Sequence, residues 1–121
     1  MKEYPANRLP LSMGNARKPL RITVVRTTEL KDIYGDTPPK GLCGQTEMTC
    51  PCFKVGDCYM VTDKGGKPPA DFPCAWAWHD LFQVVLGLQL GGNYPEFEDG
   101  VYYASCTNGL HPVFFRLERV E

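Results

Sequence analysis

The sequence predicts a small α+β domain, in which a mostly antiparallel sheet or partial barrel of four to five strands packs on one main helix. Three observations support this fold class. One apolar stripe has helical spacing, β-rich runs lie on both sides of it, and an Asn-Gly pair separates the last two of these runs. With 121 residues, of which 43% are hydrophobic and 22% charged, the chain can form one packed core but not two.

The first half of the domain is predicted to contain two strands and a short helix. LRITVVR, residues 20–26, alternates as a strand does. TELKDIY, residues 28–34, can form one or two helical turns, with Thr28 as the N-cap. After a proline-rich loop, FKVGDCYMVT, residues 53–62, reads as a second strand with an expected bulge at Gly56.

The main helix is predicted at about residues 73–90. Asp71 is the expected N-cap, and Pro73 lies in the first turn, where its missing N–H costs little. Gly91 and Gly92 are expected to end the helix. The buried stripe consists of apolar side chains at helical spacing: Trp78, Leu81, Phe82, Val85 and Leu88.

The last two strands are predicted to form a hairpin around Asn108 and Gly109. A two-residue type I′ turn at this pair would place Tyr102 opposite Phe115 and Cys106 opposite His111. Directly opposed side chains have Cβ atoms about 5 Å apart. This register therefore predicts a thiol beside an imidazole on the core side of the sheet.

The residues before the first strand are predicted to be an extended N-terminal arm, residues 1–19, ahead of a single domain at 20–121. The arm is rich in proline and basic residues, and its start has no apolar region typical of a secretory signal. Its apolar side chains have no regular period but need something to bury them: Leu9, Leu11 and Met13. We expect a homo-oligomer that forms through this arm.

The charge and hydropathy of the chain narrow the classes of partner. A formal net charge of -1 argues against a protein that binds nucleic acids or anionic membranes, because both kinds of binding require a basic surface. No run of 18 apolar residues is present, so no membrane span is expected. A cytoplasmic location is the default expectation.

The chain has six cysteines, about 5% of its residues, which is below the density of a disulfide scaffold. In a reducing compartment such thiols stay free or bind metal. No C-x-x-C pair is present, so familiar zinc and ferredoxin motifs are absent. Because six is an even number, a secreted disulfide protein remains an open alternative.

Three cysteines are the strongest candidates for a shared site. Cys74 is expected in the first helical turn, where the helix dipole and free N–H groups favour a thiolate. Cys50 lies in the rigid loop TCPCF, and Cys106 ends a strand. Converging thiolates would suit a soft metal, so zinc or an iron–sulfur centre is the candidate cofactor, with Cys52 as a further candidate ligand. Packing alone could also explain each cysteine.

His111 and Trp76 are the other candidates. A Cys–His pair formed by Cys106 and His111 could be a nucleophile with its base or two metal ligands, and a satisfied core histidine is the alternative. Cys74 and His111 are therefore also the candidate catalytic residues. Trp76 and His111 are the candidate cofactor-binding residues, although core filling would equally explain a tryptophan. His79 is expected to be solvated.

Several stretches together match the motifs of one family: LRITVVR, CPCFKVGDCYMV, FPCAWAWHDLFQVVLGLQLGGNYP and SCTNGLHPVFFRLERV. They resemble a family of small uncharacterised proteins, mostly from anaerobic bacteria and archaea. The family pattern is a valine-rich strand followed by CPxFxxGxxF, FCxWAWxD, GGxFP and CTDGxRPVxFxIER. The resemblance runs from about residue 20 to the end of the chain, and it implies no particular activity.

The resemblance singles out the same three cysteines as the local chemistry, because Cys50, Cys74 and Cys106 stand at the cysteines of the family pattern. The remaining three are additional to it: Cys43, Cys52 and Cys58. Asn108 replaces the usual aspartate, which preserves the turn chemistry. His111 replaces the usual arginine, which puts any anion-binding role at that position in doubt.

The leading hypothesis is a small protein with a site at Cys50, Cys74 and Cys106 that binds a soft metal, an iron–sulfur centre or a small molecule. An accessory or interaction protein with structural cysteines is the rival. A thiol-dependent enzyme that uses Cys74 is the third hypothesis, for which the sequence offers no clear base or oxyanion hole. Whether the chain is an enzyme is therefore left open.

Overall fold

The computed structural model describes residues 17–41, 48–63 and 65–120. The predicted α+β class is confirmed, because one four-stranded antiparallel sheet accompanies one main helix. In chain order the elements are β1 (Leu20–Arg26), α1 (Leu30–Tyr34), β2 (Cys58–Val61), α2 (Ala75–Gln89), β3 (Val101–Ser105) and β4 (Phe114–Arg119).

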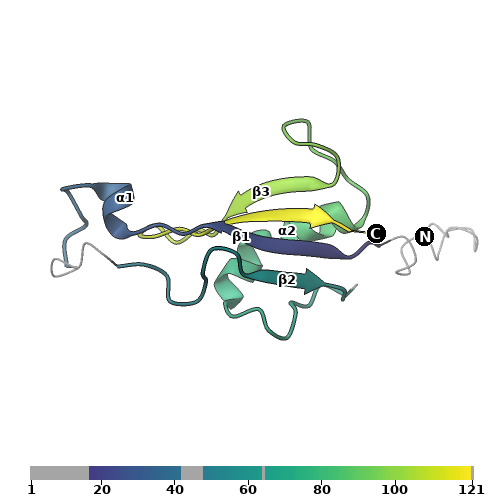
Figure 1. Cartoon of the computed structure of the whole chain (residues 1–121), viewed down its shortest axis with the longest axis horizontal. Coiled ribbons are helices and arrows are strands. Elements are labelled where there is room, and N and C mark those ends of the chain that lie inside the picture. The colour runs from purple at the N-terminus through teal and green to yellow at the C-terminus, as the bar shows by residue number, and fades with distance from the viewer. Residues whose placement is uncertain (1–16, 42–47, 64, 121) are drawn as a thin grey trace, which may run out of the picture.

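The sheet is open rather than a barrel, and its strand order is β2-β1-β4-β3. The helix α2 lies behind the sheet in Figure 1, where it packs on β1, β3 and β4. Among the described helices, only α2 covers this face. None of them is long and apolar enough to cross a membrane.

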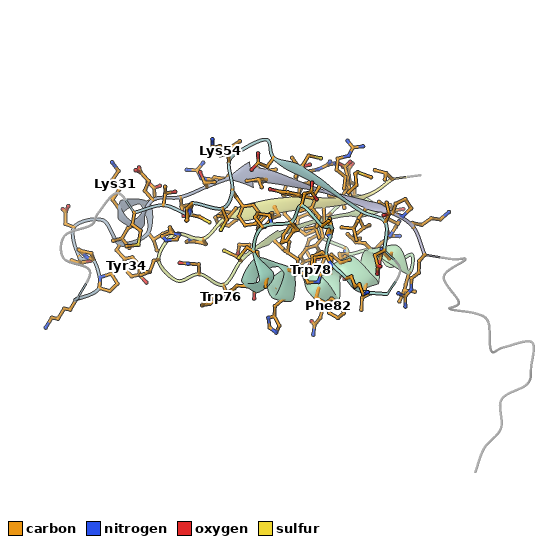
Figure 2. All side chains as sticks on the ribbon, turned by 90° about the horizontal axis from the view of Figure 1, so that it is seen from below. Lys31, Tyr34, Lys54, Trp76, Trp78 and Phe82 are labelled. Atoms are coloured by element: carbon orange, nitrogen blue, oxygen red, sulfur yellow. The ribbon has the colours of Figure 1, made fainter. Side chains whose placement is uncertain are left out.

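The hydrophobic core lies between α2 and the sheet (Figure 2). Alternate residues of β1 point into it, as the sequence pattern predicts. The helix supplies a matching apolar stripe. Aromatic rings from the loop before β2 and from the loop between β2 and α2 fill the end of the core near the start of α2. The main buried members are Leu20, Ile22, Val24, Phe53, Tyr59, Trp78, Leu81, Val85, Leu88, Val113, Phe115 and Leu117. Each fully buried side chain contributes about 1.5–3 kcal/mol relative to exposure.

The starts of both helices differ from the sequence prediction. The N-cap of α2 is Cys74, not Asp71, which is exposed and lies earlier in the loop. The N-cap of α1 is Glu29, whose N–H donates to the Asp32 carboxylate at 2.7 Å. Thr28 is instead buried, and its hydroxyl donates to the Pro112 carbonyl at 2.7 Å.

The second strand is shorter than the predicted 53–62. Gly56 lies in the turn ahead of β2 with a φ of 96°, a conformation that glycine adopts at low cost. Its N–H donates to the Val24 carbonyl at 2.8 Å, and Val24 N–H donates to the Asp57 carbonyl at 2.8 Å. This turn therefore closes against β1 instead of extending the strand.

The predicted hairpin forms, but with a different register. Tyr102 pairs with Leu117, not with Phe115, which pairs with Ala104. A type I′ turn needs a positive φ at both central residues, and Gly109 lacks one. The Asn108 side chain instead accepts hydrogen bonds from the two N–H groups that follow Gly109, which opens a wider loop.

This register error preserves the face of each side chain. A slip of two residues returns every side chain to the same side of the sheet, whereas a slip of one would reverse it. Cys106 now donates its N–H to the Val113 carbonyl at 3.0 Å, so the residue opposite it is Val113. His111 belongs to the loop, and it remains buried.

The predicted N-terminal arm lies mostly outside the described residues. Arg17, Lys18 and Pro19, its described part, adopt neither helix nor strand. The Lys18 N–H donates to the Gln89 carbonyl at 3.0 Å, and the Val120 N–H donates to the Pro19 carbonyl at 3.0 Å. The chain is therefore already attached to the end of α2 just before β1 begins.

Candidate functional site

A small pocket of about 60 Å³ lies where three segments meet: the loop before β2, the start of α2 and the loop between β3 and β4. Its lining contains all three cysteines predicted to share a site, together with His111 and Trp76. The complete lining is Cys50, Phe53, Cys74, Trp76, Ala77, Cys106, Asn108 and His111. Residues far apart in the sequence thus surround one cavity.

Each of the three pocket thiols accepts a hydrogen bond from a backbone N–H group. The donors are Cys52 N–H to Cys50 Sγ at 3.4 Å, Ala77 N–H to Cys74 Sγ at 3.3 Å, and Val113 N–H to Cys106 Sγ at 3.3 Å. Backbone donors therefore face all three sulfurs around the pocket.

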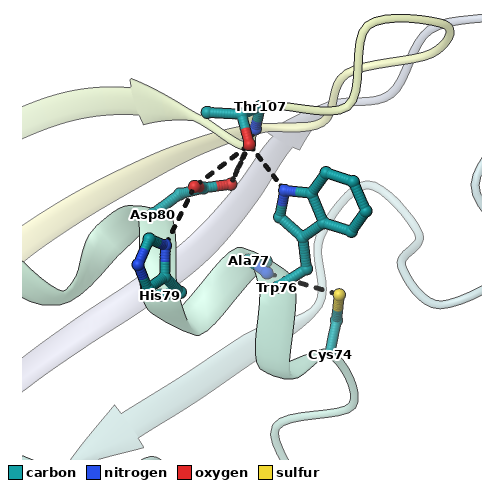
Figure 3. Close-up of polar contacts among 6 residues, drawn as sticks. All are labelled: Cys74, Trp76, Ala77, His79, Asp80 and Thr107. Atoms are coloured by element: carbon teal, nitrogen blue, oxygen red, sulfur yellow. Dashed lines mark hydrogen bonds and ion pairs between the residues drawn. The ribbon is translucent and has the colours of Figure 1, made fainter.

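The position of Cys74 follows from the start of α2. Its backbone is extended, with φ -138° and ψ 113°, and its sulfur occupies the place that a serine or aspartate oxygen takes at other N-caps (Figure 3). The positive end of the helix dipole adds to the effect of the Ala77 N–H. The sequence prediction placed Cys74 within the first helical turn, after an N-cap at Asp71, but expected the same chemistry.

Cys52 is exposed and does not line the pocket. It adjoins one of the pocket thiols, because its N–H donates to the Cys50 sulfur at 3.4 Å. Burial raises the pKa of the Cys52 thiol above its ordinary value, and the neighbouring Cys50 and Cys74 raise this pKa further. Cys52 therefore lies next to the pocket without forming part of its lining.

One further described cysteine, Cys58, lies away from the pocket. Cys58 is exposed on β2, where its sulfur accepts the hydroxyl of Thr23 at 3.9 Å. Cys43 falls outside the described residues. The five described cysteines are all free.

His111 brings an unsatisfied nitrogen to the pocket. The residue is 8% exposed, and its Nδ1 is buried with no hydrogen-bond partner among the described residues. Its backbone is held in place, because Asn108 Oδ1 accepts from Leu110 N–H at 2.8 Å and from His111 N–H at 3.1 Å. A buried polar atom without a partner is costly, which makes this nitrogen a candidate ligand atom.

A hydrogen-bonded chain connects the rim of the pocket to α2 (Figure 3). The Trp76 indole N–H donates to Thr107 Oγ1 at 2.5 Å, and this hydroxyl donates in turn to the Asp80 carboxylate at about 3 Å. The Thr107 N–H also donates to Asp80, at 2.7 Å. Thr107 follows Cys106 directly, so this chain fixes the cysteine against the helix.

Trp76 and His79 occupy more exposed positions than the other site candidates. Trp76 is 61% exposed, so it forms part of the pocket rim and does not fill the core. The His79 side chain is 88% exposed, in agreement with the sequence expectation, and its Nδ1 lies 3.6 Å from Asp80. Asp80 itself is nearly covered, with 7% of its side chain exposed.

The described residues contain no group of three or more histidine, cysteine, aspartate or glutamate side chains that could hold a metal ion as they stand. The pocket thiols and His111 share a lining without forming a finished coordination site. Any metal would have to draw these side chains closer together.

Sequence reasoning found the three thiols but missed the residues that hold them. Asp80, Thr107 and Asn108 position the loop between β3 and β4. All three stand in stretches that the sequence analysis quotes, but only Asn108 was given a structural role there, as part of the Asn-Gly pair. The contact of Asp80 with Thr107 joins residues 27 positions apart, which neither stretch reveals by itself.

Comparison with protein-family models, with curated proteins and with solved structures finds no significant match to this chain.

Proposed function

We propose that Cys50, Cys74 and Cys106 bind one soft metal ion, with His111 as the nitrogen donor. The observation that carries this proposal is a pocket lined by three thiols and by an imidazole whose Nδ1 has no partner among the described residues. A set of three sulfurs and one nitrogen is a common structural zinc set.

The size of the pocket favours an ion over an organic ligand. Pockets for drug-sized ligands usually enclose about 300–1,000 Å³, against about 60 Å³ here. The hydrogen bonds that the sulfurs accept lower the cost of keeping three thiolates together until the ion neutralises them. Sulfurs around zinc lie about 3.7 Å apart, given Zn–S bonds of about 2.3 Å, so binding would contract the pocket.

Zinc fits the lining better than an iron–sulfur centre. A cluster usually takes four cysteine thiolates, whereas the pocket lining supplies three thiols. Cys52 would have to turn into the pocket to provide a fourth. His111 is already there, and nitrogen ligation suits zinc.

Cobalt(II) titration of the reduced, metal-free chain tests this proposal. Tetrahedral sulfur ligation should produce visible bands and a sulfur-to-cobalt charge-transfer band, which zinc should then displace. Serine at position 50, 74 or 106 should weaken binding at least tenfold and reduce the charge-transfer band. Cys58→Ser is the matched control and should leave both unchanged. A chain without charge-transfer absorption at stoichiometric cobalt would contradict the proposal.

A second candidate function is a reactive thiol at Cys74. The specific observation in its favour is the N-cap position, where the helix dipole and the Ala77 N–H both favour the thiolate. In metal-free protein at pH 7, iodoacetamide should then label Cys74 faster than the more exposed Cys58. If Cys74 and Cys58 are labelled at equal rates relative to the exposure of their sulfurs, the reactive thiol has no support.

We infer further that the chain acts in the cytoplasm and associates with copies of itself through residues 1–19. In support of a reducing compartment, all five described cysteines are free. The inferred association depends on the apolar side chains of the arm, Leu9, Leu11 and Met13.

A further inference from the structure

We propose that the face of α2 that points away from the sheet is the docking surface for the N-terminal arm of a second copy of the chain. This inference rests on the proposed self-association and deepens it, because it names the surface on which residues 1–16 dock. It does not depend on the proposed metal site.

The outer face of α2 has the composition of a buried surface. Among the fifteen residues of the helix only Asp80 is charged, and its side chain is 7% exposed and bound to Thr107. A surface helix normally has charged side chains opposite its core stripe, whereas a helix without such a polar face is usually buried. The outer face of α2 should therefore be covered by a further segment.

A continuous seam of side chains follows this outer face. Its members recur at intervals of three and four residues, which places them on one side of the helix, opposite the core stripe. This α2 seam consists of Trp76, His79, Gln83, Leu86 and Leu90. The apolar side chains at its two ends are 61% and 53% exposed, which is high for tryptophan and leucine.

A groove of about 570 Å³ lies beside the first half of the seam. Its lining comprises Ala75, Trp78, His79, Asp80, Phe82 and Gln83. The rings of Trp78 and Phe82 provide its apolar part, with their centroids 6.4 Å apart. The groove thus offers the apolar side chains of a docked segment a place to insert.

The described end of the arm supports the arm as the occupant. The Lys18 N–H donates to the Gln89 carbonyl at 3.0 Å, so the arm begins at the C-terminal end of α2. Sixteen further residues precede Arg17, and an extended segment of that length reaches about 53–58 Å. A helix of fifteen residues is about 22 Å long, so the arm is long enough to follow a whole seam.

The sequence of the arm fits the spacing of the seam. Leu9, Leu11 and Met13 alternate, so an extended segment presents them on one side about 6.6 Å apart. Seam residues three or four positions apart rise by about 4.5–6 Å along the helix. Successive apolar side chains of the arm can therefore contact successive positions of the seam.

The direction of β1 favours docking on a second copy over docking on the same chain. β1 begins beside Gln89, and its far end pairs at Val24 with Phe115, whose ring lies beside Phe72 near the start of α2. β1 and α2 therefore run in opposite directions. An arm that continues the line of β1 points away from its own α2, and two copies can exchange arms around a two-fold axis.

Analytical ultracentrifugation of full-length variants tests the inference. Gln83→Lys with Leu90→Lys, the seam variant, places two charges at exposed positions of the seam. The fold should be kept, as circular dichroism checks, and the dissociation constant should rise at least tenfold. Val55→Lys with Thr62→Lys is the matched control, because it also replaces one exposed apolar and one exposed polar residue, but away from α2. It should associate like the native chain.

A mixing experiment identifies the two surfaces that meet. The seam variant retains an intact arm, and an arm variant with serine at Leu9, Leu11 and Met13 retains an intact seam. Each should be monomeric alone. An equimolar mixture should form a 1:1 complex, because the arm of the first docks on α2 of the second. This complex has one arm contact instead of two, so it is measured at the upper end of the concentration series.

The outcomes separate this inference from the proposed self-association. A mixture that stays monomeric would overturn docking of the arm on α2 of a second copy. A seam variant that associates at the native dissociation constant, beside a monomeric arm variant, would overturn it as well, while association through the arm would stand. A native chain that is monomeric throughout would contradict the association itself. An arm variant that associates like the native chain, beside a monomeric seam variant, would overturn the arm as the occupant and indicate that two α2 faces meet.

Discussion

Cys74 combines two roles at the scale of a single residue, and substitution can separate them. Its sulfur caps α2 by accepting the Ala77 N–H, and the same sulfur faces the pocket. Serine is among the best N-cap residues, whereas alanine cannot cap and typically costs about 0.5–2 kcal/mol. The two replacements should therefore remove the thiol with different effects on stability.

We expect Cys74→Ser to keep the free energy of unfolding within about 0.5 kcal/mol of the native value, or to raise it, while it loses cobalt binding. Cys74→Ala should lose both binding and about 1 kcal/mol of stability. Urea denaturation of reduced, metal-free protein measures the difference. If both variants are equally destabilised, burial of the sulfur and not capping is what holds the start of the helix.

At the scale of elements, Asp80 connects α2 to the loop between β3 and β4. The Asp80 carboxylate accepts one hydrogen bond from the N–H of Thr107 and another from the Thr107 hydroxyl. Hydrogen bonds to charged groups contribute about 1.5–3 kcal/mol net. Because Trp76 donates to the same hydroxyl, loosening this connection should free the rim of the pocket as well.

Asp80→Asn should therefore lower the free energy of unfolding by about 1–3 kcal/mol and speed hydrogen exchange at the Thr107 amide. The exposed Glu96 provides the matched control, and Glu96→Gln should change neither quantity. Unchanged exchange at Thr107 in the Asp80 variant would show that the loop is held by other contacts, such as the pairing of Cys106 with Val113.

The turn after β2 introduces a pH dependence. Backbone N–H groups of Lys67 and Gly65 donate to the Asp63 carboxylate and hold the pKa of this carboxyl below its ordinary value of 3.8. The same turn docks on α2, because the Trp78 indole N–H donates to the Gly66 carbonyl at 3.2 Å.

A lowered folded pKa means that ionised Asp63 stabilises the fold above its ordinary pKa, and that this stabilisation disappears as pH falls through the lowered value. The stability difference between native protein and Asp63→Asn should thus be constant at neutral pH and shrink below about pH 4. Urea denaturation from pH 2.5 to 7 measures it, with Asp99→Asn as the control. A difference that persists at pH 2.5 would assign the effect to the turn geometry instead of the charge.

The elements were predictable from the sequence to the extent that local patterns determine them. β1 has Leu20, Ile22 and Val24 on one face, and α2 has its apolar residues at helical spacing, so both are found close to the predicted ranges. The hairpin register depends on how the Asn108 side chain bonds to the loop, which the Asn-Gly signal does not specify. The N-caps differ for a similar reason, because several residues in each loop were chemically able to cap.

At the scale of the whole molecule, the pocket was only partly predictable. Cys50, Cys74 and Cys106 lie at a loop, a helix start and a strand end, and small folds gather functional side chains at such places. Their meeting in one pocket agrees with that expectation. The contact of Asp80 with Thr107 joins residues 27 positions apart, so it depends on tertiary packing that no local pattern encodes.

The N-terminal arm is expected to mediate association of the chain with copies of itself. The two described backbone hydrogen bonds of its end, from Lys18 to Gln89 and from Val120 to Pro19, already secure the start of β1. A chain that lacks residues 2–16 keeps both of these bonds. Its core should therefore fold as before, with a free energy of unfolding per monomer within about 1 kcal/mol of the native value.

If the arm mediates association, the truncated chain should sediment as a monomer at concentrations where the full chain is an oligomer. A full-length variant with serine at Leu9, Leu11 and Met13 should behave like the truncation, because it removes the apolar surface that the arm would bury on a partner. The matched control changes polar positions instead, Asn7→Ser with Asn15→Ser, and should associate like the native chain. Analytical ultracentrifugation over a hundredfold range of concentration gives the answer. A full chain that stays monomeric over that range would contradict association through the arm. A truncated chain that unfolds at much lower urea would instead place the arm in the core of its own domain.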